Sequence, residues 1–349
     1  MSAPETTSAP VPAAWPARLS GLGRPLGLAA FALAAFALVL LAFGKNPIRA
    51  YADIFASTLG SWYGVSETLV KLAPLLLTAI AVAVPGRIWL INVGGEGQLH
   101  IGALFATWGA LTFSAWPPWL LLPAMAILGF LGGGLWAAVP GVLRARGWAG
   151  ETISTLLLNY VAILLVQYAV FGPWKDPEGV NYPQTAEFSA AAILPTLGGS
   201  RAHLGIAFAL IALGAFAFAI RRTRWGFEMR AIGGNPEAAR RAGIPIGTYV
   251  VVLMLIGGGL AGLAGMAEVS AIQGRLRTSL SPGYGYTGFL ISWMASGHPA
   301  GILAAALLLA VTTAGGDILQ MTQALPGSVV NILMAVTLFA VLGSRSGAR

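Results

Sequence analysis

Long apolar runs separated by short polar segments recur along this chain. Runs of about 18 or more residues, counted with their flanks, are long enough to cross a membrane as helices. They are Leu26–Phe43, Thr68–Val84, Trp119–Val139, Thr152–Phe171, Leu204–Ile220, Val250–Val269 and Ile302–Ala314. Shorter runs that supply further spans are Ile101–Trp116, Gly285–Ala295 and Gly327–Leu342. The pattern predicts an all-α, polytopic membrane protein with about ten transmembrane helices.

The composition supports a membrane protein. Hydrophobic residues make up 57% of the 349 residues and charged residues only 9%, against roughly 25% charged in a soluble domain. The chain has no cysteine, and its three histidines, His100, His203 and His298, lie far apart in the sequence. We therefore expect no bound metal or other cofactor, no disulfide and no thiol nucleophile. An intramembrane enzyme would need a nucleophile and a base, so the sequence argues against catalysis.

The distribution of Lys and Arg predicts how the chain is oriented. In the predicted topology, thirteen of the 20 basic residues lie on the side that holds both termini and six on the other, while Lys71 lies within a span. Because basic loops stay in the cytoplasm, both termini are expected there. The net charge of +8 is thus explained by topology and the lipid surface, without nucleic acid. We expect a disordered cytoplasmic tail over 1–25, a membrane domain over 26–343 and a second cytoplasmic tail over 344–349.

The cytoplasmic loop 221–248 is strongly basic and contains signals for a short capped helix. In order, these are Asn235 as N-cap, Pro236 at the first helical position, Glu237 near the positive end of the dipole, Ala238, Ala239, then Arg240 and Arg241 near the negative end, and Gly243 as terminator. A helix this short is marginal by itself in water. The loop therefore predicts an element that docks onto a partner.

A polar, glycine-rich segment interrupts the apolar pattern before the run that begins at Ile101. It places three glycines beside Asn92, Glu96 and Gln98. Flexible backbone with amide and carboxylate side chains at a helix start is typical of a polar site in a broken membrane helix. The alternative is a cytoplasmic turn in which Asn92 and Glu96 only cap the next helix, and the sequence leaves both readings open.

A second set of polar residues follows one helical run: Glu151, Thr155, Asn159 and Gln167. Steps of four residues place Thr155 and Asn159 on one face, with Gln167 nearby. These side chains either bind neighbouring helices or line the path of a polar solute. Two further acidic residues, Glu268 and Asp317, lie near span ends. Their side chains either snorkel to the membrane surface or have a function, and the sequence does not decide between these readings.

Gly257, Gly259 and Gly262 form the pattern G-x-G-x-x-G, but they lie inside an apolar run with no preceding strand. Close helix packing through small residues explains this pattern better than dinucleotide binding does. We interpret 132–134 in the same way. The sequence contains no G-x-x-x-x-G-K-[ST] motif, so ATP hydrolysis by a P-loop is not expected in this chain.

Three motifs in order resemble a known family. They are Asn92-Val-Gly-Gly-Glu-Gly-Gln98, Glu151-Thr-Ile-Ser-Thr-Leu-Leu-Leu-Asn159-Tyr, and Gly233-Gly-Asn235-Pro-Glu-Ala-Ala239-Arg-Arg-Ala-Gly243-Ile. Over about residues 20–343 they resemble the permease subunits of bacterial ABC importers for ribose, branched-chain amino acids and nucleosides, and most closely the nucleoside type. The segment Met294-Ala-Ser-Gly-His298-Pro departs from the family pattern.

The resemblance implies a multi-pass subunit of the bacterial plasma membrane that pairs with a second permease, homologous or identical. A separate ATPase subunit would use the ATP, and an extracytoplasmic solute-binding protein would deliver the solute. The segment 236–242 would be the helix that couples the permease to the ATPase. Nucleosides are the expected solute, with ribose or another sugar as the alternative; the path residues would be Asn92, Glu96, Gln98, Thr155, Asn159 and Gln167. An ion-coupled secondary transporter would be expected to carry more paired ionisable residues within its spans.

Overall fold

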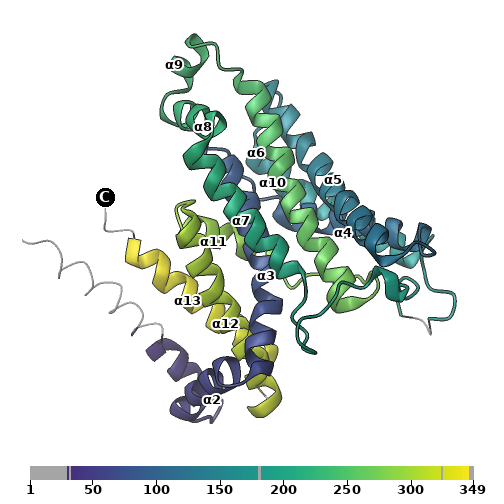
Figure 1. Cartoon of the computed structure of the whole chain (residues 1–349). Helices are drawn as coiled ribbons and strands as arrows, with labels where there is room; N and C mark the ends of the chain where they lie inside the picture. Colours follow the sequence, from purple (N-terminus) through teal and green to yellow (C-terminus); the bar gives the residue numbers. More distant parts are fainter. Residues whose placement is uncertain (1–29, 31–32, 180–181, 324, 346–349) are drawn as a thin grey trace, which may run out of the picture.

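The computed structural model describes residues 30, 33–179, 182–323 and 325–345, which form a bundle of helices (Figure 1). The helices are α2 (Pro47–Leu59), α3 (Trp62–Gly86), α4 (Gly95–Thr112), α5 (Pro118–Ala145), α6 (Glu151–Phe171), α7 (Gly205–Arg222), α8 (Arg224–Gly234), α9 (Pro236–Arg241), α10 (Ile246–Glu268), α11 (Tyr284–Met294), α12 (Pro299–Gln323) and α13 (Gly327–Arg345). The described residues contain two isolated β-bridges and no strand, which confirms the all-α prediction. The predicted tail 1–25, and 346–349 of the second predicted tail, lie outside the described residues.

Six of the described helices are long and apolar enough to cross a membrane: α3, α5, α6, α7, α10 with its continuation to Gln273, and α12. A seventh span is possible if Leu33–Ala42 and α2 are counted together, although they are bent by 114°. The three shorter predicted runs correspond to α4, α11 and α13, which are helical but are not among the six. The total of ten spans and the cytoplasmic termini therefore stay predictions.

The centre of the bundle is α10, which packs against α3, α4 and α5. Glycines allow very close approach: a Cβ added at Gly262 would lie 2.1 Å from the carbonyl oxygen of Gly129 on α5. A Cβ added at Gly102 of α4 would lie 2.1 Å from the Cα of Gly262. A Cβ added at Gly258 would lie 2.4 Å from the carbonyl oxygen of Gly133 on α5. This confirms the interpretation of the glycine pattern as helix packing.

The chain forms an ordered cap at the end of α10 that lies opposite α8 and α9 (Figure 1). We call the segments 182–204 and 274–283 the outer cap, because the predicted topology places them outside the membrane. Thr185 and Leu276 join the two segments: the Thr185 N–H donates to the Leu276 carbonyl and the Leu276 N–H to Thr185 Oγ1, both at 3.0 Å. Phe188 adds a backbone hydrogen bond to the Gly274 carbonyl at 2.8 Å.

Candidate functional site

The first turns of α4 and α11 meet inside the bundle. A Cβ added at Gly285 would lie only 2.1 Å from the backbone nitrogen of Glu96. Thr78 of α3 donates a hydrogen bond from Oγ1 to the Tyr284 carbonyl at 3.0 Å. Thr78 lies eight residues before the end of α3 at Gly86, which is about 12 Å along a helix. Both helix starts therefore lie well inside the span that α3 provides.

The Glu96 carboxylate occupies the junction between these two helix starts. Its Oε2 accepts a hydrogen bond from the Gly285 N–H at 2.8 Å, and the residue is buried. Helix N-termini carry partial positive charge, so a carboxylate placed between two of them is stabilised by both. Glu96 thus caps α11. Glu96 also lies in the first turn of α4, so it joins two helix starts and does not act on its own helix alone.

Asn92 and Gln98 hold the segment that leads into α4. Their side-chain amides exchange two hydrogen bonds, Asn92 Nδ2 to Gln98 Oε1 at 3.0 Å and Gln98 Nε2 to Asn92 Oδ1 at 2.8 Å. Asn92 Oδ1 also accepts from the Gly94 N–H at 3.0 Å. Both side chains are fully buried, so this pairing satisfies amide groups that would otherwise be costly to bury.

Helix α6 binds the same segment from the other side. Asn159 Oδ1 accepts from the Gly97 N–H at 2.8 Å, and Asn159 Nδ2 donates to the Val93 carbonyl at 2.9 Å. Thr155 Oγ1 accepts from the Val93 N–H at 3.3 Å. Gln167 lies about two turns beyond Asn159 along α6 and has no hydrogen bond to any described residue.

Five of the six predicted path residues therefore come together, and Gln167 does not. We call the five the buried polar network: Asn92, Glu96, Gln98, Thr155 and Asn159. Each of their side chains already has a partner in the protein. The sequence did not indicate the other members of this region. These are His100, whose Nδ1 lies 2.8 Å from the Glu96 carbonyl, and Tyr286, whose hydroxyl lies 3.4 Å from Asn159 Nδ2.

Glu151, the first of the four polar residues on α6, closes the inner end of this region. Its Oε1 accepts from the Ile91 N–H at 3.3 Å, and its Oε2 forms an ion pair with Arg144 Nε at 3.0 Å. The segment before α4 is therefore bound to α6 at three successive positions, Glu151, Thr155 and Asn159. The arrangement fixes the start of α4 in position.

The predicted short helix is present as α9. Asn235 Oδ1 accepts from the Ala238 N–H at 3.0 Å, and Gly243 has a φ of +82°, the left-handed conformation that glycine favours at a helix end. Glu237 forms ion pairs with Arg240 at 3.2 Å and Arg241 at 3.3 Å. All of these charged side chains are exposed, and Ala239 is the one buried residue of the helix. The exposed face of α9 is thus highly charged.

The structure adds a helix that the sequence analysis did not predict. Helix α8 begins at Arg224, with Thr223 as N-cap accepting from the Gly226 N–H at 3.2 Å. A threonine at this position is an N-cap signal from which the start of the helix could have been predicted. Trp89, just beyond α3, donates from Nε1 to the Gly233 carbonyl at 2.6 Å. Helices α8 and α9 form a hairpin, which we call the docking hairpin, and it is held against the end of α3.

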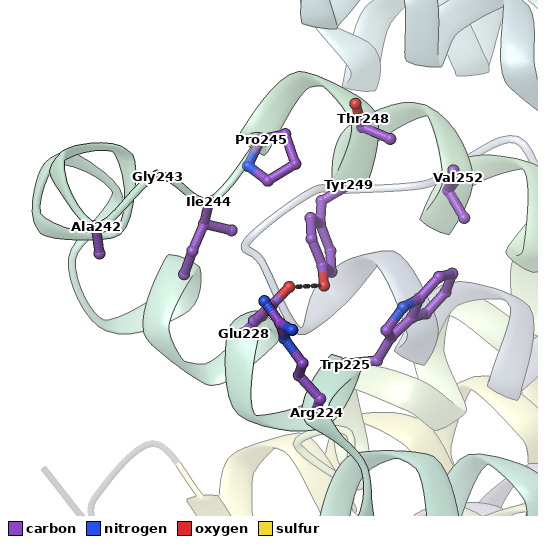
Figure 2. A pocket seen from close by; sticks show the side chains of 10 residues that line it. All are labelled: Arg224, Trp225, Glu228, Ala242, Gly243, Ile244, Pro245, Thr248, Tyr249 and Val252. Carbon is purple, nitrogen blue, oxygen red and sulfur yellow. Dashed lines mark hydrogen bonds and ion pairs between the residues drawn. The ribbon is translucent and has the colours of Figure 1, made fainter.

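A pocket of about 440 Å³ lies between the docking hairpin and the first turns of α10 (Figure 2). Glu228 lies at its wall, where it accepts a hydrogen bond from the Tyr249 hydroxyl and pairs with Arg224 Nε at 2.6 Å. These two interactions, the Tyr249 hydrogen bond first, lower the pKa of Glu228 below its usual value. The rings of Trp225 and Tyr249 lie 5.9 Å apart. Glu228 is therefore ionised, and Arg224 balances its negative charge. Its hydrogen bond with Tyr249 connects α8 to α10.

Comparison with known proteins identifies the family. Residues 64–342 match the family described as branched-chain amino acid transport system / permease component. A glucose ABC transporter permease protein of Haloferax volcanii is 37% identical over 92% of this chain and 87% of its own length. A nucleoside ABC transporter permease protein of Lactococcus lactis is 32% identical over 91% of this chain and 89% of its own. A guanosine ABC transporter permease protein of Bacillus subtilis is 32% identical over 94% of both chains. The chain therefore belongs to this family of ABC transporter permease subunits, which are membrane transport proteins and not enzymes.

Proposed function

We propose that this chain is the membrane subunit of a binding-protein-dependent importer that takes up nucleosides across the bacterial plasma membrane. In this proposal ATP is hydrolysed by separate ATPase subunits, and the docking hairpin transmits their movement. The observation that carries the proposal is the capped, charged helix α9, which projects its polar face away from the bundle while α8 is bonded to α10. The absence of a P-loop motif from the sequence fits this division of labour.

The proposed coupling follows from how the docking hairpin is held. An exposed short helix can be recognised in a groove of a partner, and the residues for this role are those of the predicted helix, Asn235 to Arg241 with Gly243. Movement of the hairpin would reach α10 through Glu228 and Tyr249. Because α10 contacts α4 and α5 through glycines without intervening side chains, α10 cannot move without displacing them. Rigid movement of packed helices is a common basis of switching between two states.

The solute is proposed to be a nucleoside because two relatives at 32% identity carry nucleoside or guanosine transport in their names. A sugar is the second candidate, favoured by the 37% identity to a glucose permease. Both classes are neutral solutes with several hydroxyl groups. We propose that the buried polar network frames the solute path and that exposed residues beside it, such as Tyr286, contact the solute; Gln167 stays a separate candidate on the same helix.

The partners in this proposal are those of the family: an ATPase subunit, an extracytoplasmic solute-binding protein and a second permease, homologous or identical. The half-exposed ion pair of Lys71 with Asp317, at 2.9 Å, supports the presence of a second membrane subunit or an aqueous path. Charged groups on the surface of a span avoid hydrocarbon and face protein or water instead.

The test is uptake of radiolabelled guanosine, adenosine, ribose and glucose into vesicles that contain the complete transporter, with and without ATP inside. ATP-dependent uptake of a nucleoside is expected. Uptake of a sugar alone would move the assignment to the second candidate, and uptake that does not need ATP would favour an ion-coupled transporter.

The role of α9 is tested in the same vesicles by Arg241→Glu. The variant reverses an exposed charge on α9 and is expected to lower uptake by about tenfold or more, because a groove that accepts a basic face rejects an acidic one. Arg146→Glu reverses an exposed charge in another predicted cytoplasmic loop and serves as the matched control. Equal uptake by the two variants, with equal amounts of assembled transporter, would refute the coupling role.

A further inference from the structure

Three buried polar groups at the outer end of α10 have no partner among the described residues. The Glu268 carboxylate forms no hydrogen bond or ion pair there, although the residue is only 7% exposed. His203 is 2% exposed and its Nε2 is unpaired, as is the buried Oε1 of Gln273. We call these three residues the outer polar site. Unpaired buried polar groups are rare in native proteins, and each one calls for an explanation.

The local backbone brings these groups to one end of the bundle. Glu268 is the last residue of α10, and a π-helix follows directly over Val269–Gln273; such π segments frequently occur at functional sites. A Cβ added at Gly205 would lie 2.6 Å from the His203 ring and 3.1 Å from the Ala267 Cβ. His203 therefore lies beside the residue that precedes Glu268.

The outer cap covers this end of α10. Ser270, in the π-helix, donates from Oγ to the Ala192 carbonyl at 2.6 Å and accepts from the Leu194 N–H at 3.1 Å. The outer polar site therefore lies directly beneath the outer cap, toward the side from which an importer receives its solute.

The hydrogen-bonding capacity of the site can be assigned group by group. His203 Nδ1 accepts from the Gly205 N–H at 3.1 Å, so the ring proton is on Nε2, which is a free donor. Burial, and then the charge of Arg201, lowers the pKa of His203 to about 4, so the ring is neutral near pH 7. Gln273 uses its Nε2 to donate to the Leu280 carbonyl at 3.0 Å, which leaves Oε1 as a free acceptor.

The neighbouring cations are already engaged. Lys71 pairs with Asp317 at 2.9 Å and Arg201 with Glu67 at 3.1 Å. Both cations lie near enough to act electrostatically on Glu268, yet neither forms an ion pair with it. The contrast with the buried polar network is clear, because every member there has a partner in the protein. A buried carboxylate within a span is costly and is a functional-site hypothesis by default.

We propose that the outer polar site binds a neutral solute through vicinal hydroxyl groups. The two oxygens of the Glu268 carboxylate accept from adjacent hydroxyls, His203 Nε2 donates to a solute oxygen, and Gln273 Oε1 accepts a further hydrogen bond. Hydroxyls both donate and accept, so they match a site with free groups of both kinds. This inference rests on the proposed function, and the vicinal hydroxyls are chemistry that the ribose of a nucleoside shares with a free sugar.

The test uses the natural absence of cysteine from the chain. In right-side-out vesicles with the complete transporter, Ala271→Cys is treated with a charged, membrane-impermeant thiol reagent added outside. Ala271 is a partly exposed residue of the π-helix, three residues after Glu268, so the variant keeps all three groups of the outer polar site. We expect labelling that guanosine or glucose slows by about tenfold at concentrations well above their dissociation constants. Glu178→Cys, an exposed and unpaired carboxylate position in the chain segment before the outer cap, should be labelled without protection. Leu253→Cys, buried in the middle of α10, should stay unlabelled.

Two results would overturn the proposal: Ala271→Cys labelled no faster than Leu253→Cys, or labelled without protection by guanosine, adenosine, ribose or glucose. Which solute protects distinguishes a nucleoside from a sugar. If guanosine protects, 2′,3′-dideoxyguanosine, which lacks the vicinal hydroxyls, should protect about tenfold less well; equal protection would refute the role of the hydroxyls. The labelling does not need ATP, so its outcome is separate from the uptake assay that tests the proposed function.

Discussion

Tyr249, in the first turn of α10, donates a hydrogen bond from its hydroxyl to the Glu228 carboxylate of α8 (Figure 2). The tyrosine is buried, and the same carboxylate pairs with the exposed Arg224. This contact joins the docking hairpin to the helix at the centre of the bundle. A loop that only connected two spans would not need a partly buried, charge-assisted bond of this kind.

Tyr249→Phe removes this bond and little else. We expect ATP-driven uptake to fall by about tenfold while the assembled transporter still hydrolyses ATP, because a hydrogen bond to a charged group is stronger than one between neutral groups and this bond joins the docking hairpin to α10. The measurement is the ratio of solute imported to ATP hydrolysed. Arg224→Gln is the matched control at the same carboxylate: its ion pair is exposed, so the ratio should change little. An unchanged ratio in Tyr249→Phe would show that the bond does not take part in coupling.

Asn159→Leu is predicted to destabilise the protein strongly. The substitution leaves the Gly97 N–H and the Val93 carbonyl without their partner, and each unpaired buried group costs about 1–3 kcal/mol. Thermal unfolding of the purified protein in detergent measures the effect. Gln167→Leu makes the same chemical change on the same helix, where the amide has no described partner, and should cost far less. Similar losses for both variants would contradict the assigned role of Asn159.

The sequence predicted features that depend on near neighbours in the chain. Asn235 and Gly243 cap α9 as expected, because a cap is determined by the residues within a few positions of it. Thr155 and Asn159 share a face as the helical period requires. Gln167 was grouped with them by spacing, but eight residues on an α-helix rise about 12 Å, which separates it from Asn159.

Contacts between distant segments were not predictable in this way. Glu96 accepts from Gly285, a residue 189 positions away, and no local pattern indicates that two helix starts meet. Helix α8 was missed although Thr223 provides a cap, because its apolar residues do not form a long run. Of the outer polar site, the sequence analysis noted Glu268 and left its role open, but it did not connect this residue with His203 and Gln273. These three residues are notable for the partners they lack, and that is visible only when the fold is known.

Gly262→Ala tests the glycine contact between α10 and α5. Its Cβ would lie 2.1 Å from the Gly129 carbonyl oxygen, so the helices must separate, at a cost of about 1–3 kcal/mol or more. The measurement is thermal unfolding in detergent. Gly214→Ala, in α7, is the control: no described atom lies within 4 Å of the new Cβ, and the helix gains up to about 1 kcal/mol from alanine. If Gly262→Ala were as stable as Gly214→Ala, the close packing of α10 on α5 would be wrong.

The lowered pKa of His203 predicts that protonation of this residue destabilises the protein over a defined pH range. Its pKa is about 4 in the folded state, lowered by burial and by Arg201 from the usual value of 6.5, so the unfolded chain binds a proton at this residue first as the pH falls. The stability that results is complete above about pH 6.5 and is lost progressively toward about pH 4, a total of about 3 kcal/mol. The measurement is the unfolding temperature across this range for the protein and for His203→Gln, whose profile should be flatter. His298→Gln, at an exposed histidine, should keep the profile of the unmodified protein, and a His203→Gln profile as steep as that control would show that another group causes the acid sensitivity.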